Sequence, residues 1–317
     1  MILEPKPLAF RPVYKSYLWG GRHLPPQYNR ADAPEVCAES WEISGHSEGM
    51  SIVDGGAHAG ETLDALARRF GAQLTGRPLE KFPLIFKLIN ARERLSVQVH
   101  PSDAAALAHG GEAKSEMWFM LGEGKIYAGL REGVDEKNFR AAIETKTVES
   151  LLVQHDVREG DAIYIPGGLI HAIGENCLVY EVQQASDTTY RLFDWERSRK
   201  LHIEQGMRVT DWQLATPCVV RAREHGHSRE HGHSCPCVLY RDIVRCEYFH
   251  MRELVLNGSE TVASGGSCHA LFIKRGTARV SSGGATLEAA CGKSVLLPAC
   301  CGAYALEGDA EILITTL

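Results

Sequence analysis

Residues 160–166 read Gly-Asp-Ala-Ile-Tyr-Ile-Pro, a glycine turn followed by an apolar strand that ends at a proline. Residues 292–298 repeat this design as Gly-Lys-Ser-Val-Leu-Leu-Pro. Upstream of each stretch, residues 118–124 and 271–276 both carry an apolar segment into a turn glycine. A strand, a glycine turn and a strand that stops at proline are what a β-barrel used twice in one chain would show.

Short apolar segments surround the first copy, and glycine or proline separates them. Alternation of apolar residues and flanking turn residues predict strands at 84–89, 96–100, 117–121, 125–130, 162–165, 170–173 and 178–183. A helix is expected over 62–70, where Thr62 can cap the N-terminus, and a helical pair over 136–143 and 148–153. The proline-rich residues 2–60 are expected to be irregular. Many short strands favour an antiparallel barrel or jelly roll over an alternating βαβ fold.

The composition indicates a globular chain, with 44% hydrophobic and 23% charged residues. Its net charge is −6 and its basic residues are not clustered, which argues against nucleic-acid partners but leaves room for a small phosphorylated substrate. The first residues show neither a basic nor an apolar signal region, so no secretory signal is expected, and no apolar run approaches the roughly 20 residues that a membrane span requires. We expect a cytoplasmic protein whose ten cysteines are reduced thiols.

The composition of the sequence changes between residues 213 and 237, where polar residues, glycine and histidine replace the apolar strand-like segments. Residues 225–233 carry four histidines among glycine and polar residues, which predicts a solvated linker, with binding of a stray divalent metal as the alternative. The expected division of the chain is a first domain at 1–220 with a short helical insertion at about 134–155, a linker at 221–237, and a second β domain at 238–317.

The two copies of the repeat differ in residues that can carry chemistry. His171 follows the proline of the first copy by five residues, where the second copy has Ala303. Glu116 precedes the turn glycine of the first copy by eight residues, where the second copy has Cys268. The scaffold alone therefore does not require this histidine and this carboxylate.

Gln98 and His100 add two further candidates, because residues two apart on a strand point to the same face. With Glu116 and His171 they could surround one cation inside the barrel. Two imidazoles and a carboxylate suit Zn²⁺ with a position left open for water or substrate, and such a centre polarises carbonyl oxygens. The alternatives are structural histidines and a Glu116 that simply pairs with Lys114. No enzyme class follows from these residues alone.

Longer stretches carry a family resemblance. In chain order they are residues 19–21, 39–42, 95–101, 114–118, 160–172 and 181–191. Their order and spacing resemble the type I phosphomannose isomerases in their short bacterial form, over nearly the whole chain. The resemblance implies a mainly β cupin fold, a double-stranded β-helix or jelly roll with a few helices, and a second, metal-free cupin-like domain. It also implies interconversion of mannose 6-phosphate and fructose 6-phosphate through a cis-enediol, with one Zn²⁺ per chain.

The resemblance carries over to individual residues. It implies the zinc ligands Gln98, His100, Glu116 and His171. It implies the catalytic residues Arg191, Glu181 and Lys114, and the substrate-binding residues Ser96, Lys87 and Asp187. Glu181 is a candidate proton carrier or, alternatively, a strand glutamate that faces solvent. Arg191 could clamp the phosphate, stabilise an enediolate or form an ion pair with Asp187 or Asp194, and the catalytic base stays unassigned.

The expected partner is a small sugar phosphate, and the expected assembly is a monomer or a homodimer. Two other functions stay open at this point. One is a different metal-dependent cupin enzyme, such as a cupin-type phosphoglucose isomerase or a dioxygenase. The other is a non-catalytic sugar-binding cupin, which the complete ligand set together with Arg191 argues against.

Overall fold

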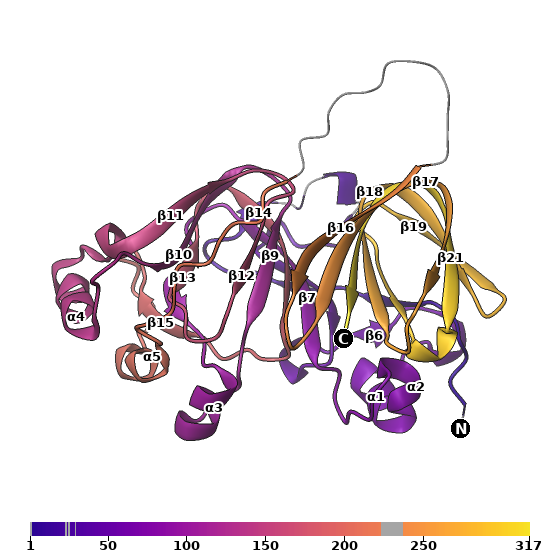
Figure 1. Ribbon diagram of the computed structural model, residues 1–317, viewed down its shortest axis with the longest axis horizontal. Coiled ribbons are helices and arrows are strands. Elements are labelled where there is room, and N and C mark those ends of the chain that lie inside the picture. Colours follow the sequence, from indigo (N-terminus) through magenta and orange to yellow (C-terminus); the bar gives the residue numbers. More distant parts are fainter. Residues whose placement is uncertain (1, 23, 25, 29, 223–236) are drawn as a thin grey trace, which may run out of the picture.

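The computed structural model describes residues 2–22, 24, 26–28, 30–222 and 237–317. Figure 1 shows two β-barrels side by side along the long axis of the molecule, with the first barrel on the left. The histidine-rich tract at 225–233 lies outside the described residues. Within them, no helix has the length and apolar character needed to cross a membrane.

The first barrel is built from two antiparallel sheets. The six-stranded sheet has the order β12-β9-β14-β7-β5-β2, and the five-stranded sheet has the order β11-β10-β13-β8-β15. The bounds are β2 Val13–Lys15, β5 Glu39–Ser44, β7 Leu84–Ala91, β8 Val97–Val99, β9 Glu116–Met120, β10 Gly124–Leu130, β11 Leu152–Val157, β12 Ala162–Ile165, β13 His171–Ile173, β14 Cys177–Gln184 and β15 Tyr190–Phe193. Alternate residues of each strand point to opposite faces, so the inner face can combine an apolar layer with a polar site.

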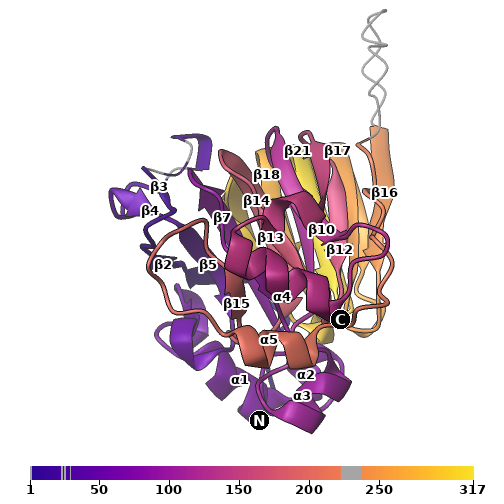
Figure 2. The same cartoon turned by 90° about the vertical axis from the view of Figure 1, so that its left-hand side faces the viewer.

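Helices cover the side of the first barrel that faces away from the second barrel. Figure 2 shows α4 (Glu136–Thr145) and α5 (Ile203–Val209) in front of the five-stranded sheet. Buried residues from these helices, such as Phe139 and Met207, pack with Val97 and Leu192 of that sheet. The remaining helices are α1 Leu63–Phe70, α2 Ala72–Thr75 and α3 Asp103–His109.

The second barrel is one eight-stranded sheet. Its order is β16-β17-β21-β18-β20-β1-β6, and β19 pairs with β18 beside this path. The bounds are β1 Leu8–Arg11, β6 Ile52–Val53, β16 Cys237–Arg245, β17 His250–Ala263, β18 His269–Ser282, β19 Ala285–Ala290, β20 Ser294–Leu297 and β21 Ala303–Thr316. An apolar cluster that includes Leu254, Leu271 and Ile312 is buried among these strands.

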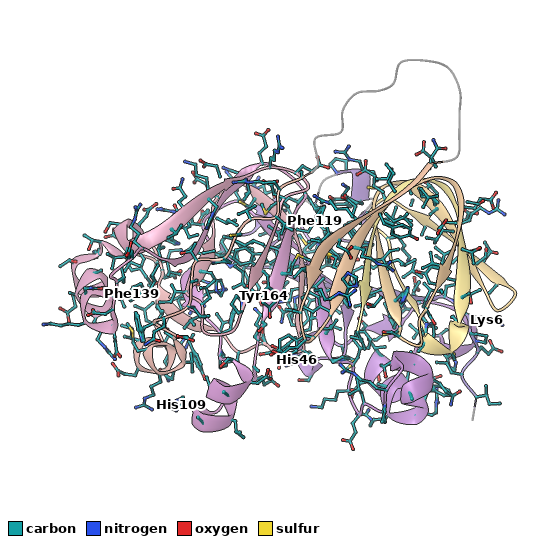
Figure 3. The ribbon with its side chains drawn as sticks, in the orientation of Figure 1. Lys6, His46, His109, Phe119, Phe139 and Tyr164 are labelled. Atoms are coloured by element: carbon teal, nitrogen blue, oxygen red, sulfur yellow. The ribbon has the colours of Figure 1, made fainter. Side chains whose placement is uncertain are left out.

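The two barrels meet through an aromatic layer. Tyr180, on the outer face of the six-stranded sheet, stacks on Phe272 of β18 with ring centroids 4.4 Å apart. Phe119 belongs to the same buried cluster and Tyr164 packs against it, and Figure 3 labels both between the barrels. Burial of such large rings supplies much of the energy that holds packed sheets together.

The N-terminal segment does not have the irregular structure expected for residues 2–60. β1 pairs with β20 and with β6 in the second barrel, whereas β2 and β5 extend a sheet of the first. The two short strands β3 Gly21–Arg22 and β4 Val36–Cys37 pair with each other. This prediction was wrong because the strands are short and their partners lie far away in sequence. The division at residue 220 stays a proposal. The strands at residues 8–11 and 52–53 precede this division but belong to the sheet of the second barrel.

The other expected elements compare closely with the structure, with one exception. The helix expected at 62–70 is α1, and the Thr62 hydroxyl accepts a hydrogen bond from the Ala65 amide at 3.2 Å. The helix expected at 148–153 is wrong: Val148–Leu151 form one 3₁₀ turn, and the chain then enters β11. Pairing of β11 with β10 overrides the local helical preference.

Candidate active site

Three strands of the first barrel bring the four predicted ligands together. Gln98 of β8 lies opposite His171 of β13, and His100 follows β8 on the same face as Gln98. Glu116 begins β9 in the facing sheet. The side-chain donor atoms of His100, Glu116 and His171 all lie within 4.8 Å of one another. The three side chains are at most 1% exposed.

Backbone carbonyls fix the orientation of both imidazoles. His100 Nδ1 lies 2.8 Å from the Thr188 carbonyl oxygen, and His171 Nδ1 lies 2.9 Å from that of Leu169. A carbonyl only accepts, so each Nδ1 carries the proton and each Nε2 keeps its lone pair for the cluster. Burial lowers the pKa of His171 to about 4 and holds that of His100 well below its ordinary value. Both rings are therefore neutral at pH 7, the form that binds metals.

The Glu116 carboxylate completes the donor set. Its Oε1 lies 3.4 Å from His171 Nε2 and its Oε2 lies 3.6 Å from His100 Nε2. Both oxygens are buried, and Oε1 accepts no hydrogen bond from the described residues. The Lys114 ammonium lies 2.9 Å from Oε2, so the ion pair considered from the sequence is present too. Two imidazoles and a carboxylate with free electron pairs fit a divalent metal ion.

Gln98 borders the same cluster from β8. Its Nε2 lies 3.3 Å from His171 Nε2 and 3.5 Å from His100 Nε2, and its Oε1 accepts from the Ser96 hydroxyl at 3.3 Å. The two ends of a glutamine amide exchange by rotation, and the network decides which end faces a group. Rotation of this amide would present its oxygen to the cluster.

A row of side chains crosses the six-stranded sheet on the inner face of the barrel. Trp41 of β5 lies opposite Lys87 of β7. Lys87 lies opposite Glu181 of β14, which in turn lies opposite Trp118 of β9. The Lys87 ammonium is 3.5 Å from Glu181 Oε1, and the Trp118 indole N–H donates to Glu181 Oε2 at 2.9 Å. Burial lowers the pKa of Lys87, but the Glu39 and Glu181 carboxylates outweigh that effect and raise it, so the ammonium stays charged.

A cavity of about 290 Å³ opens between this row and the candidate metal site. This site, the metal cluster, consists of His100, Glu116 and His171. The predicted residues among its lining are Ser96, Lys87, Gln98, Lys114, Glu181, Asp187 and Arg191. Glu181 is 3% exposed, which excludes a solvent-facing strand glutamate. Asp187, in contrast, is an exposed residue.

Arg191 lies beside the metal cluster, opposite Gln98 in the pairing of β15 with β8. Its Nη1 donates to the Lys200 carbonyl at 2.7 Å, and its buried Nε has no hydrogen-bond partner among the described residues. Asp194 binds Arg199 rather than Arg191, with Arg199 Nε 2.8 Å from Asp194 Oδ2. Burial and the positive charge of Arg199 lower the pKa of Arg191. A guanidinium at a cavity wall suits an anionic ligand.

The cavity also contains residues that the sequence did not single out as site residues. They are Tyr17, Trp19, Glu39, Ile89, Leu95, Trp118, Ile173, Thr189 and Arg199. Trp19, Glu39 and Trp118 fall within stretches that carried the family resemblance, so a signal was present without an assigned role. For Arg199 the sequence offers only a short basic run after Asp194.

Comparison with known proteins identifies the family. A family model for the type I phosphomannose isomerase catalytic domain matches residues 8–121, and one for the mannose-6-phosphate isomerase cupin domain matches residues 241–317. The chain is 32% identical to the probable mannose-6-phosphate isomerase GmuF of Bacillus subtilis, over 98% of both chains. It belongs to the mannose-6-phosphate isomerase family. It is also 31% identical to mannose-6-phosphate isomerase ManA of the same organism, over 99% of this chain and all of ManA.

A solved structure supports the same family. The crystal structure of mannose 6-phosphate isomerase from Bacillus subtilis superimposes with a TM-score of 0.86 at 26% identity, over 98% of this chain and 100% of the other. The mainly β cupin fold expected from the resemblance is confirmed, and the chain is an isomerase of this family.

The second barrel of the chain has a different residue at the position of Glu116. β12 pairs with β9 so that Ile165 lies opposite Glu116, and β20 pairs with β18 so that Leu297 lies opposite His269. The counterpart of Glu116 is therefore His269 and not Cys268. Counting back from the turn glycine was wrong by one, because the second copy has one residue fewer before it.

Proposed function

We propose that this chain interconverts mannose 6-phosphate and fructose 6-phosphate by proton transfer between C1 and C2 through a cis-enediol, with one zinc ion bound per chain. The observation that carries the proposal is the cavity of about 290 Å³, which gathers the predicted acidic and cationic residues next to the metal cluster. Aldose–ketose isomerisation requires a proton carrier and stabilisation of the developing negative charge in one water-poor site.

Gln98, His100, Glu116 and His171 would hold the zinc. A zinc ion bound there would supply a Lewis acid for the sugar oxygens at C1 and C2. The buried, neutral imidazoles and the Glu116 Oε1, which accepts no hydrogen bond from the described residues, support this assignment.

Glu181 is our candidate for the residue that carries the proton. The Trp118 indole fixes its Oε2, whereas its buried Oε1 accepts no hydrogen bond from the described residues and lies 3.5 Å from the Lys87 ammonium. A carboxylate held at one oxygen and only loosely paired at the other can take a proton from one sugar carbon and return it to the neighbouring carbon.

Positive side chains would bind the rest of the substrate. Arg191 lines the cavity, and the charge of its guanidinium supports contact with the phosphate or with the enediolate. Lys114, which is 6% exposed and lines the cavity, would add a second positive charge near the reacting carbons. Ser96 and Asp187 would contact the substrate at the cavity wall. We further propose that residues 1–220 supply all of these groups.

Isomerisation of mannose 6-phosphate in D₂O tests the proposal. If the proton passes through a side chain that exchanges with solvent, fructose 6-phosphate will carry deuterium at C1, which proton NMR detects. Solvent deuterium at C1 would exclude a direct hydride shift from C2 to C1, because such a shift takes no hydrogen from solvent. Absence of product from mannose 6-phosphate would argue against the reaction itself.

A further inference from the structure

Lys87 has an unusual set of partners for a buried lysine. It is 4% exposed, and its ammonium lies 3.5 Å from Glu181 Oε1 and 3.6 Å from Glu39 Oε2. It also lies over the Trp41 ring, 4.5 Å from the ring centroid. Neither carboxylate is at the 2.7–2.9 Å typical of a charge-assisted hydrogen bond. The ammonium is therefore shared almost equally between the two carboxylates.

Each of the two carboxylates is held by an indole. The Trp41 N–H donates to Glu39 Oε2 at 2.6 Å, and the Trp118 N–H donates to Glu181 Oε2 at 2.9 Å. Both tryptophans are 1% exposed, and their strands belong to the same sheet as β7. The Lys87 ammonium thus lies between two indole-held carboxylates: Glu39 faces it with the oxygen that Trp41 binds, and Glu181 faces it with the oxygen that Trp118 leaves free.

The charge of Glu39 has a direct consequence for Glu181. Glu39 and Glu181 contribute two negative charges and Lys87 contributes one positive charge. These three side chains together therefore leave one net negative charge beside the cavity. Without the charge of Glu39, Glu181 would be the only carboxylate of the described residues within 4 Å of the buried ammonium. The attraction between two unlike charges is strong where water is excluded, so the Lys87–Glu181 pair would close.

We propose that Glu39 is a positioning residue for the isomerisation: by sharing the Lys87 ammonium, it keeps the Glu181 carboxylate directed into the cavity and free to take a proton. This inference rests on the proposed function of Glu181 as proton carrier. It adds a role for a cavity residue that contacts neither the metal cluster nor, on this proposal, the reacting atoms.

Glu39→Gln is the primary test, because it removes the charge and keeps the size of the side chain. We expect kcat for mannose 6-phosphate to fall by about tenfold to hundredfold, at or below the lower end of acid–base contributions, because Glu181 itself is still present. KM should change by less than about threefold, since a residue that acts on Glu181 affects the proton step more than binding. Glu35→Gln is the matched control, because the exposed Glu35 pairs only with the exposed Arg22 among the described residues.

A double-mutant cycle separates positioning from a general structural effect. If Glu39 acts through Lys87, Glu39→Gln will change kcat little further in a Lys87→Met background, because coupled residues are not additive. Equal losses in both backgrounds would overturn the inference. A Glu39→Gln variant with the kcat of the wild type would also overturn the inference.

Two further measurements keep the outcome clear. Glu39→Asp retains the charge and should recover part of the kcat lost in Glu39→Gln, whereas an equal loss in both would contradict a charge-based role. Wild-type protein that fails to turn over mannose 6-phosphate would overturn the proposed function and this inference with it. Active wild type with an unaffected Glu39→Gln would overturn the inference alone.

Discussion

At the scale of single residues, the metal cluster is organised by contacts outside it. The carbonyls of Thr188 and Leu169 hold the two imidazoles by Nδ1, so each Nε2 faces Glu116 before any ion binds. Outer contacts of this kind fix the tautomer and the ring orientation of a metal ligand. The ligand side chains therefore lose little conformational entropy when an ion binds.

His171→Ala should weaken zinc binding by at least about tenfold to hundredfold and abolish turnover, because it removes one of two neutral nitrogen ligands. The protein should stay folded, since the side chain lies in a polar cluster rather than in an apolar core. Zinc content after dialysis and far-UV circular dichroism measure the two effects. Turnover with zinc still bound would contradict the ligand assignment, and His109→Ala on the exposed end of α3 is the control.

The sequence predicted which residues meet at the site better than it predicted their surroundings. Gln98 and His100 followed from strand alternation, and Glu116 and His171 from the difference between the two repeats. The orientation of Glu181 depends on the pairing of β14 with β7 and β9, which no local pattern reveals. The exposure of Asp187 likewise depends on how a loop lies over the barrel.

At the scale of elements, the same strand position serves two purposes in the two barrels. In β9 it holds Glu116 of the metal cluster, and in β18 it holds the buried His269. One ring nitrogen of His269 lies 2.9 Å from the Tyr304 hydroxyl and the other lies 3.1 Å from the Ser264 carbonyl. The Ser264 carbonyl accepts the ring N–H and the Tyr304 hydroxyl donates to the other nitrogen, which leaves no nitrogen lone pair for a metal.

His269 should make the stability of the protein depend on acidity. Burial lowers its pKa to about 4, below the value of about 6.5 for an unfolded histidine, so between these pH values only the unfolded state binds the proton. The contribution of neutral His269 to the free energy of unfolding is therefore complete above about pH 6.5 and is lost as the pH falls to about 4. The expected loss is on the order of 3 kcal/mol.

Urea unfolding at several pH values measures this effect. His269→Gln should be less stable at pH 7, because it disturbs two buried hydrogen bonds, yet its free energy of unfolding should fall less steeply between pH 6.5 and pH 4. The difference between wild type and variant removes the contribution of the other titrating groups. Identical slopes would contradict the assignment. Zinc content should stay unchanged, because His269 lies in the other barrel.

Elements that pair with distant strands were the hardest to predict. β1 pairs with β20 across almost the whole chain, and β5 pairs with β7 across a segment that contains α1 and α2. Local patterns identified the longer strands of the first barrel, because alternation and turn residues are local. The short N-terminal strands owe their structure to their partners, so their own sequence gives little indication of them.

At the scale of the whole molecule, the N-terminal segment joins the two barrels. Arg30 Nη2 donates to Glu42 Oε2 of β5 at 2.6 Å and to the Gly292 carbonyl before β20 at 2.5 Å. The Ser294 hydroxyl of β20 donates to the same carboxylate oxygen at 3.3 Å. A buried, hydrogen-bonded charge at a contact between barrels can specify one arrangement of the two. The first barrel thus presents its cavity on a scaffold that the second barrel supports.

Zinc-dependent turnover of mannose 6-phosphate tests the central claim most directly. Isomerase activity would be measured in a coupled assay on the purified chain, after treatment with a chelator, and after addition of one equivalent of zinc. The account predicts that activity disappears with the chelator and returns with zinc at one ion per chain. Full activity in protein shown to be free of metal would contradict it, as would stoichiometric zinc in a protein that does not isomerise mannose 6-phosphate.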